Sequence, residues 1–168
     1  MSLASLSRVS VAAALALGLA LGACARNNAD ESAALNGAYG APGSGPGSIQ
    51  EFAASVGDRV FFETDSTELT ATAQATLDKQ ASWLNQYGRY TFTIEGHADE
   101  RGTREYNFAL GARRAEAAKD FLIAKGVSAA RIKTISYGKE RPVAVCDDIS
   151  CWSQNRRAVT VLAGAAGS

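Results

Sequence analysis

The run over residues 96–115, GHADERGTREYNFALGARRA, constrains the fold of this chain more than any other part of the sequence. It follows residues 90–95, where apolar and polar side chains alternate as in a half-buried strand. Its second half has helical spacing, which predicts a helix over about 103–125, with Gly126 just past the C-terminus. A strand, a charged turn and a helix therefore follow one another. Binding residues in open sheets with helices are often found at such strand ends.

The remaining elements predict an α+β domain. Aromatic and β-branched residues favour strands over 59–63, 131–137 and 158–162, and one-sided apolar spacing favours a helix over 69–86. An irregular segment that contains Pro142 and two cysteines separates the last two strands. The order βαβαββ implies two layers, in which helices pack on a four-stranded mixed sheet.

Each predicted helix has a start signal or a buried stripe that can be read from the sequence. Residues 65–67 offer capping side chains ahead of the first helix. The side chains expected on the two buried stripes are Leu69, Ala73, Leu77, Ala81 and Leu84 in the first helix, and Tyr106, Leu110, Ala117 and Phe121 in the second.

The N-terminal segment has the pattern of a secretory signal peptide, which predicts removal of residues 1–23. Arg8 is the only charged residue before Cys24, and residues 9–23 are apolar or small. A retained membrane-spanning anchor is the alternative, but it needs about 20 apolar residues. The segment ends in Leu-Gly-Ala-Cys, which looks like a bacterial lipobox. We therefore expect lipid on Cys24 rather than the chance cysteine of an ordinary secreted protein.

Residues 24–50 are expected to form a tether between the lipidated cysteine and the globular domain. The segment is rich in small and polar residues, with Pro42 and Pro46 among glycines and serines. Such a composition cannot bury enough apolar surface to offset the entropy of ordering it. Fully stretched, the tether would reach roughly 85 Å. The globular domain then covers residues 51–168, which is long enough for one hydrophobic core.

Cys146 and Cys151 remain once Cys24 carries lipid. In an oxidising periplasm this pair could close a short ring, worth roughly 2 kcal/mol in the loop-entropy model. Two free thiols, or half of a metal site, are the alternatives that the sequence leaves open. His97 is the only histidine, and the cysteine spacing does not match a zinc knuckle, so no metal site is expected.

Asp99 and Arg114 are the candidate binding pair. Asp99 comes just after the strand at 90–95, while Asn107, Leu110 and Arg114 share one helix face. Folding the strand end beside the helix can bring a carboxylate and a guanidinium to one cleft. A zwitterion would fit there, with its ammonium on Asp99 and its carboxylate on the planar fork of Arg114. The alternative is that the two side chains pair with each other or cap the helix.

Composition and the candidate side chains argue against two broad classes of function. The chain has 17 basic and 17 acidic residues, so no bulk attraction to nucleic acid is expected. His97 stands near Asp99, but no serine or cysteine nucleophile pattern accompanies it. We therefore expect a binding protein that is not an enzyme and needs no cofactor.

Four stretches of sequence together resemble one known family. They are G-H-A-D-E-R-G-T-R-E-Y-N-F-A-L-G-A-R-R-A at 96–115, V-F-F-E-T-D-S at 60–66, S-Y-G-K-E-R-P at 136–142 and W-S-Q-N-R-R-A-V at 152–159. With the lipobox, they resemble the peptidoglycan-associated lipoprotein family of Tol–Pal systems, within the OmpA-like superfamily of wall-binding domains. The resemblance covers nearly all of residues 51–163 and implies an OmpA-like fold.

The resemblance also implies a binding site. In that superfamily, the acid of the G-H-x-D motif and the second arginine of R-R-A bind the zwitterionic end of meso-diaminopimelate in the peptidoglycan stem peptide. These positions are Asp99 and Arg114 here. Residues that would line or shape the same pocket are Phe62, Asp65, Arg101, Asn107 and Leu110. Cys146 and Cys151 depart from the family pattern, so the conformation of their loop does not follow from the resemblance.

The location and partners that the resemblance implies are those of an envelope clamp. The lipid on Cys24 would hold the outer membrane from its periplasmic face, and Ala25 fits export to that membrane. The Tol periplasmic proteins (TolB and TolA) would be partners, and the protein would support envelope integrity and constriction at cell division. An OmpA-like wall anchor outside the Tol system is one alternative. A wall-processing enzyme is another, although the chain offers it no nucleophile–base pair.

Overall fold

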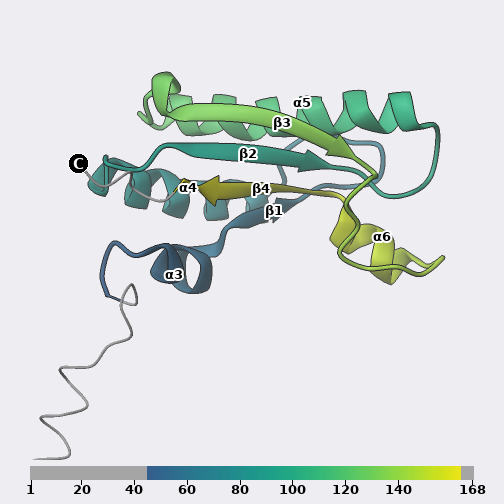
Figure 1. Ribbon diagram of the computed structural model, residues 1–168, viewed down its shortest axis with the longest axis horizontal. Coiled ribbons are helices and arrows are strands. Elements are labelled where there is room, and N and C mark those ends of the chain that lie inside the picture. The colour runs from purple at the N-terminus through teal and green to yellow at the C-terminus, as the bar shows by residue number, and fades with distance from the viewer. Residues whose placement is uncertain (1–44, 164–168) are drawn as a thin grey trace, which may run out of the picture. The chain divides into compact units, whose positions relative to one another are not determined.

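The computed structural model describes residues 45–163 (Figure 1). The predicted signal peptide 1–23, the lipid acceptor Cys24 and most of the predicted tether lie outside these residues. The helical and extended elements, in chain order, are α3 (Ile49–Glu51), η1 (Phe52–Gly57), β1 (Arg59–Phe61), α4 (Ala71–Gln86), β2 (Phe92–His97), α5 (Arg104–Ala124), η2 (Ala129–Arg131), β3 (Ile132–Gly138), α6 (Ile149–Asn155) and β4 (Arg157–Leu162).

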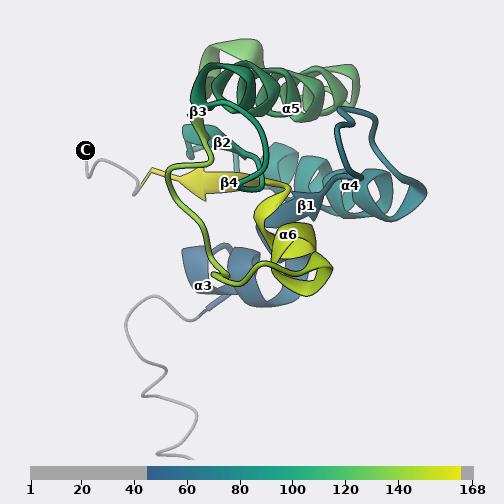
Figure 2. The same cartoon turned by 90° about the vertical axis from the view of Figure 1, so that its right-hand side faces the viewer.

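The four strands form one mixed sheet in the order β1-β4-β2-β3. β2 pairs parallel with β3, and β4 pairs antiparallel with both β1 and β2. Figures 1 and 2 show α4 and α5 together on one face of the sheet, and α6 at the end where β3 stops and β4 begins. The predicted class, an α+β domain with helices on a four-stranded mixed sheet, is confirmed.

The core lies between the sheet and the two long helices, and backbone contact makes it thin at one end. Leu84 and Ile94 are fully buried in this core. A Cβ atom added at Gly96 of β2 would lie 1.8 Å from the carbonyl oxygen of Gly111 in α5. Strand and helix can approach this closely only because both positions lack a side chain. The helix face that follows Gly111, including Arg114, is therefore held close to the end of β2.

The buried face of α5 differs by one position from the predicted stripe. Leu110 is buried as expected, but Tyr106 is 45% exposed and Phe121 is only half-buried. The residues that α5 buries are Asn107, Leu110, Gly111, Arg114, Ala115, Ala118 and Leu122. Ala117 is likewise only half-buried, and its neighbour Ala118 is buried in its place, because the close approach of β2 turns the face with Gly111, Ala115 and Ala118 toward the sheet. The predicted C-terminal glycine is confirmed, because Gly126 has φ +90° directly after the helix.

The segment predicted to be irregular contains a short helix, which corrects the predicted order βαβαββ. α6 begins after Asp148, whose side chain accepts a hydrogen bond from the backbone N–H of Ser150. An aspartate at this position is a strong helix start. The helix is too short to show a clear apolar period, so the sequence pattern did not reveal it.

The first long helix starts later than predicted. Thr70, not the residues at 65–67, caps α4 by accepting a hydrogen bond from the N–H of Ala73. The preceding loop has another role, because the carbonyl oxygens of Glu63 and Ser66 both accept hydrogen bonds from Arg114.

The packed domain begins before the predicted boundary at residue 51. Gly47 is buried, and its carbonyl oxygen accepts hydrogen bonds from the Tyr90 hydroxyl at 2.7 Å and from Arg89 at 2.6 Å. The side chain of Ser48 caps α3. The last residues of the predicted tether are therefore fixed to the start of β2. Among the residues that the structure describes, no helix is both long and apolar enough to cross a membrane.

Candidate binding site

A pocket of about 270 Å³ lies at the end of β2, between the β1–α4 loop and the first half of α5. Its lining residues are Thr64, Asp65, Asp99, Arg101, Gly102, Tyr106, Asn107, Leu110 and Arg114. Six of the seven pocket residues named from the sequence are among them. The seventh, Phe62, is buried beneath the pocket with its ring 5.2 Å from the guanidinium carbon of Arg114.

Arg114 reaches the pocket from the buried face of α5 and is fully buried. Its guanidinium donates to the carbonyl oxygens of Ser66 at 2.9 Å, His97 at 2.9 Å and Glu63 at 3.1 Å. No acidic side chain within residues 45–163 forms an ion pair with it. Burial, and then the charge of Arg156, lower the pKa of Arg114 to about 10. The side chain thus remains a cation at neutral pH, and all of its hydrogen-bond partners are backbone carbonyls.

Asp99 stands at the opposite side of the pocket and is held by two arginines. Its carboxylate lies 2.6 Å from Arg101 and 3.3 Å from Arg156. Burial opposes the charged form, but hydrogen bonds and charge from Arg101, with a further hydrogen bond from Arg156, outweigh it. The pKa of Asp99 therefore lies below its ordinary value, and the group is a carboxylate at neutral pH. The predicted alternative, a direct Asp99–Arg114 ion pair, is not formed.

The rim of the pocket is built from the β1–α4 loop. Asp65 has φ +55°, the left-handed region, which aspartate tolerates better than most residues. Its carboxylate accepts a hydrogen bond from the hydroxyl of Tyr106, which explains why that ring leaves the core. The side chain of Asn107 donates to the carbonyl of Arg101 at 2.7 Å and so fixes the loop between β2 and α5.

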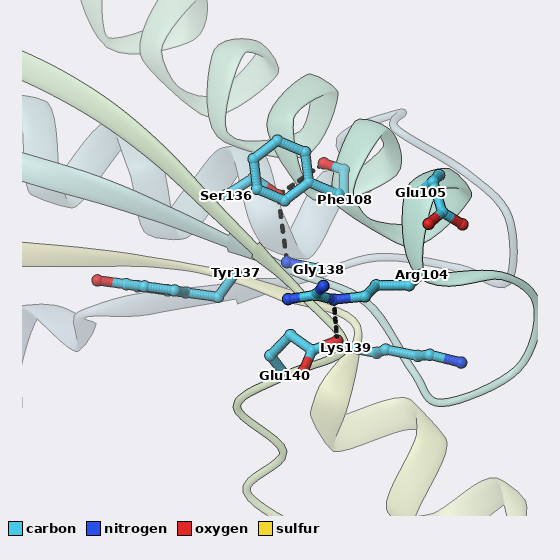
Figure 3. A pocket seen from close by; sticks show the side chains of 8 residues that line it. All are labelled: Arg104, Glu105, Phe108, Ser136, Tyr137, Gly138, Lys139 and Glu140. Atoms are coloured by element: carbon cyan, nitrogen blue, oxygen red, sulfur yellow. Dashed lines mark hydrogen bonds and ion pairs between the residues drawn. The ribbon is translucent and has the colours of Figure 1, made fainter.

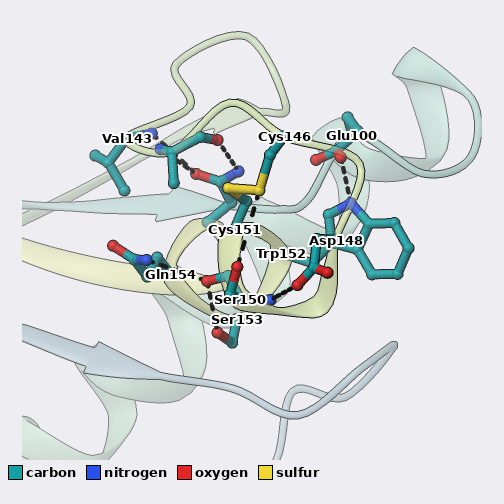
Figure 4. The surroundings of a disulfide bond; sticks show 11 residues. Glu100, Val143, Cys146, Asp148, Ser150, Cys151, Trp152, Ser153 and Gln154 are labelled. Carbon is teal, nitrogen blue, oxygen red and sulfur yellow. Dashed lines mark hydrogen bonds between the residues drawn. A yellow bond between two sulfur atoms is a disulfide. The ribbon is translucent and has the colours of Figure 1, made fainter.

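Two residues at α6 contact groups that line the pocket, and Figure 4 shows this helix with the loop before it. The ring of Trp152 lies over the guanidinium of Arg101, with 4.2 Å between its centroid and the guanidinium carbon, and its N–H donates to Glu100. Arg156, just past α6, carries the second bond to Asp99. Cys146 and Cys151 form a disulfide, with Cα atoms 5.7 Å apart.

Sequence reasoning did not assign five residues to this site: Thr64, Gly102, Tyr106, Trp152 and Arg156. Trp152 and Arg156 lie inside the W-S-Q-N-R-R motif, so that motif was a usable signal. Tyr106 was assigned to the core because its position fits a helical stripe. Its hydrogen bond to Asp65 depends on tertiary structure and leaves no local pattern.

His97 does not contribute a side chain to the pocket. It is buried, and burial, followed by the charges of Arg157 and Arg141, lowers the pKa of its imidazole to about 4. The ring is therefore neutral at neutral pH, and only the carbonyl of His97 contacts Arg114. Within residues 45–163, no cluster of three or more histidine, cysteine or acidic residues could hold a metal ion.

A larger groove of about 620 Å³ lies on the other side of the first turns of α5 (Figure 3). The exposed ring of Phe108 lines it. Three of its four charged side chains have partners, because Arg104 pairs with Glu140 at 3.0 Å and the Lys139 amine donates to the carbonyls of Glu100 and Gly102. This groove lacks an unpaired buried charge, so the smaller pocket is the better candidate site.

The fold is that of an OmpA-like domain, and a profile of the OmpA family matches residues 61–156. A peptidoglycan-associated lipoprotein of Mesorhizobium japonicum is 62% identical over 163 residues, 97% of each chain. Another from Agrobacterium fabrum is 63% identical over 161 residues, 95% of this chain and 91% of that one. The crystal structure of the peptidoglycan-associated lipoprotein from Burkholderia pseudomallei aligns with a TM-score of 0.63 at 41% identity, over 66% of this chain and 96% of that one. The chain belongs to the peptidoglycan-associated lipoproteins of the OmpA family.

Proposed function

We propose that the domain binds peptidoglycan non-covalently by holding the zwitterionic end of meso-diaminopimelate in the stem peptide. One observation carries this proposal. Arg114 is a fully buried cation without an acidic partner among the described residues, and it shares a pocket with the carboxylate of Asp99. A buried charge without a counter-ion is costly, so a ligand that supplies one gains affinity.

The ligand chemistry follows from the two groups. Three of the five N–H groups of Arg114 are used by carbonyls, which leaves donors for a carboxylate. Asp99 already accepts from Arg101 and Arg156, and a carboxylate has further acceptor sites for an ammonium. An amino acid end carries both charges on one carbon atom. The pocket volume of about 270 Å³ suits such a small group rather than a whole polymer strand.

The rest of the proposal concerns where the domain acts. Lipid on Cys24 anchors the protein to the outer membrane from the periplasmic side, and the segment before Gly47 links that anchor to the domain. The protein thus ties the membrane to the wall. As part of a Tol–Pal system it contacts the Tol periplasmic proteins and supports envelope integrity and constriction at division. The names of the relatives and the lipobox support this assignment.

The direct test is sedimentation with purified sacculi. The wild-type domain should pellet, and free meso-diaminopimelate should release it by competition. Asp99→Ala and Arg114→Ala should remain in the supernatant, whereas Arg113→Ala, an exposed neighbour on α5, should pellet as the wild type does. Undiminished pelleting of both pocket variants would overturn the proposal.

Two rival functions are separated by simple experiments. Crosslinking in cells followed by purification should recover the Tol periplasmic propeller, and its absence would favour a wall anchor outside the Tol system. Incubation with sacculi should release no muropeptides, because the two carboxylates of the pocket are held by Tyr106 and by arginines, and no nucleophile–base pair lies beside them. Released muropeptides would indicate a wall-processing enzyme instead.

A further inference from the structure

We infer that Trp152 is a positioning residue for the wall-binding pocket and that the Cys146–Cys151 disulfide maintains its position, so that reduction weakens ligand binding. This inference rests on the proposed function, since it concerns the affinity of the same pocket. It starts from a feature that this function leaves unused. The disulfide lies outside the pocket, but the helix that it braces carries Trp152, which stacks on Arg101, and ends next to Arg156.

The first contact is the stack between Trp152 and Arg101. Arg101 has a long side chain that is 40% exposed, so its rotamers would be free without a neighbour. The indole ring covers its guanidinium at 4.2 Å, and the indole N–H is held by the carboxylate of Glu100. A cation–π contact fixes the plane of the guanidinium. Arg101 is thereby kept on Asp99 instead of swinging into the pocket.

The second contact runs through the backbone. α6 ends at Asn155, and the next residue, Arg156, donates to Asp99 at 3.3 Å and to the carbonyl of Phe62 at 3.0 Å. A shift of α6 would move this guanidinium with it. Both arginine side chains that hold the pocket carboxylate therefore depend on where a seven-residue helix lies. A helix of this length has little stability of its own in water.

α6 is fastened to the preceding loop at both ends. At its start, the disulfide joins Cys151 to Cys146. At its end, the Asn155 side chain accepts from the N–H groups of Val143 and Ala144 and donates to the carbonyl of Ala144. Figure 4 shows the side chain of Trp152, which follows Cys151 in the chain, directed toward Glu100. Opening the ring leaves only the Asn155 end fastened.

The chemical step is a thiol–disulfide exchange with a dithiol reductant. The bond between the Cys146 and Cys151 sulfurs breaks, and each sulfur gains one electron and one proton. The dithiol loses two electrons and two protons and closes its own disulfide. The first turn of α6 is then free to fray, and Trp152 covers Arg101 for a smaller fraction of the time. Less pre-organisation of Asp99 means weaker binding.

Calorimetric titration of a soluble stem tripeptide with meso-diaminopimelate tests the role of Trp152. Trp152→Ala should bind about fivefold more weakly, the size of an exposed cation–π contact. Trp152→Phe, which keeps a ring over Arg101, should recover most of the affinity. Ile149→Ala, an exposed position on the same helix, should bind as the wild type does. Equal affinity of the Trp152→Ala variant and the wild type would overturn the positioning role.

The role of the disulfide is tested by the same titration with and without dithiothreitol. Reduced wild type should bind about threefold more weakly, as expected for partial loss of pre-organisation. The double variant Cys146→Ser/Cys151→Ser should match the reduced protein and ignore the reductant. An unchanged affinity on reduction would overturn this inference alone. If the oxidised wild type does not bind the tripeptide, the proposed function fails and this inference fails with it.

Discussion

Asp99 and Arg114 face the same pocket, but the protein holds the two charges by opposite means. Arg114 is fixed by three backbone carbonyls, from the β1–α4 loop and the end of β2. Asp99 is fixed mainly by the side chains of Arg101 and Arg156, both of which depend on α6, with one further bond from the backbone N–H of Arg101. Main-chain partners cannot be changed by substituting a side chain, whereas side-chain partners can. The cation end of the site is therefore built into the fold, and the anion end is adjustable.

The largest effect is expected when the built-in end is altered conservatively. Arg114→Lys keeps the charge, but an ammonium cannot reach three carbonyls in three directions and still offer two parallel donors. Binding to sacculi or to the stem tripeptide should weaken by about 100-fold, the cost of losing a charge-assisted bidentate contact. Arg113→Lys is the matched control and should bind normally. Wild-type affinity of the Arg114→Lys variant would mean that ligand binding needs only a positive charge at this position.

The next effect tests whether backbone contact places Arg114. In Gly111→Ala, the new methyl group would lie 2.5 Å from the Ser136 hydroxyl and 2.8 Å from the carbonyl oxygen of Gly96. Urea unfolding should show a loss of about 1–3 kcal/mol, as for other overpacked cores. Gly88→Ala is the control, because nothing lies within 4 Å of its added methyl group. Equal stability of the two variants would show that the close approach of α5 to β2 is dispensable.

A smaller effect is expected at the adjustable end. Asp99→Asn keeps the shape of the side chain but removes its charge, so an ammonium loses its ionic partner. Affinity for the stem tripeptide should fall about tenfold, less than for Arg114→Lys, because hydrogen-bond acceptance by the amide oxygen remains. Asp120→Asn, at an exposed position of α5, serves as the control. A loss at Asp99 larger than at Arg114 would reverse the order of the two ends.

The smallest effect is a pH dependence of stability that Asp99 should produce. Its pKa in the folded protein is lowered, so the carboxylate stabilises the fold above the unfolded pKa of about 3.9. This stabilisation should disappear as the pH falls through the lower folded pKa. Urea unfolding from pH 6 to pH 3 should therefore show a shallower decline for Asp99→Asn than for wild type. Parallel curves would contradict the assigned pKa direction.

Much of this architecture could be predicted from the sequence because periodic patterns mark long elements. Alternation predicted β2, and one-sided spacing predicted α4 and α5. The pocket pair was predicted because one member follows a strand and the other shares a helix face with Leu110. The family motifs then favoured a ligand-binding role for Asp99 and Arg114 over a direct ion pair between them. These predictions used neighbours in the chain or a known pattern of residues.

What the sequence could not predict depends on contacts between distant segments. No local signal indicates that the carbonyls of Glu63 and Ser66 receive the guanidinium of Arg114. The W-S-Q-N-R-R motif marks Trp152 and Arg156, but it does not indicate the bond from Arg156 to Asp99. Tyr106 fits a buried stripe on spacing alone. The contact between Gly96 and Gly111 turns a neighbouring face of α5 toward the sheet, so Tyr106 is not buried. A backbone carbonyl can accept a hydrogen bond whatever its residue type, and a short helix shows no clear apolar period.

The two hydrogen bonds to the carbonyl of Gly47 determine how force would travel through the domain. A pulling force on the chain before Gly47 acts on its hydrogen bonds to Tyr90 and Arg89, which lie immediately ahead of β2. The pocket lies just past the opposite end of the same strand. β2 thus connects these two points, and it is hydrogen-bonded to β3 on one side and to β4 on the other. Tension along a strand loads its ladder hydrogen bonds together in shear, so they resist as a group rather than opening one after another.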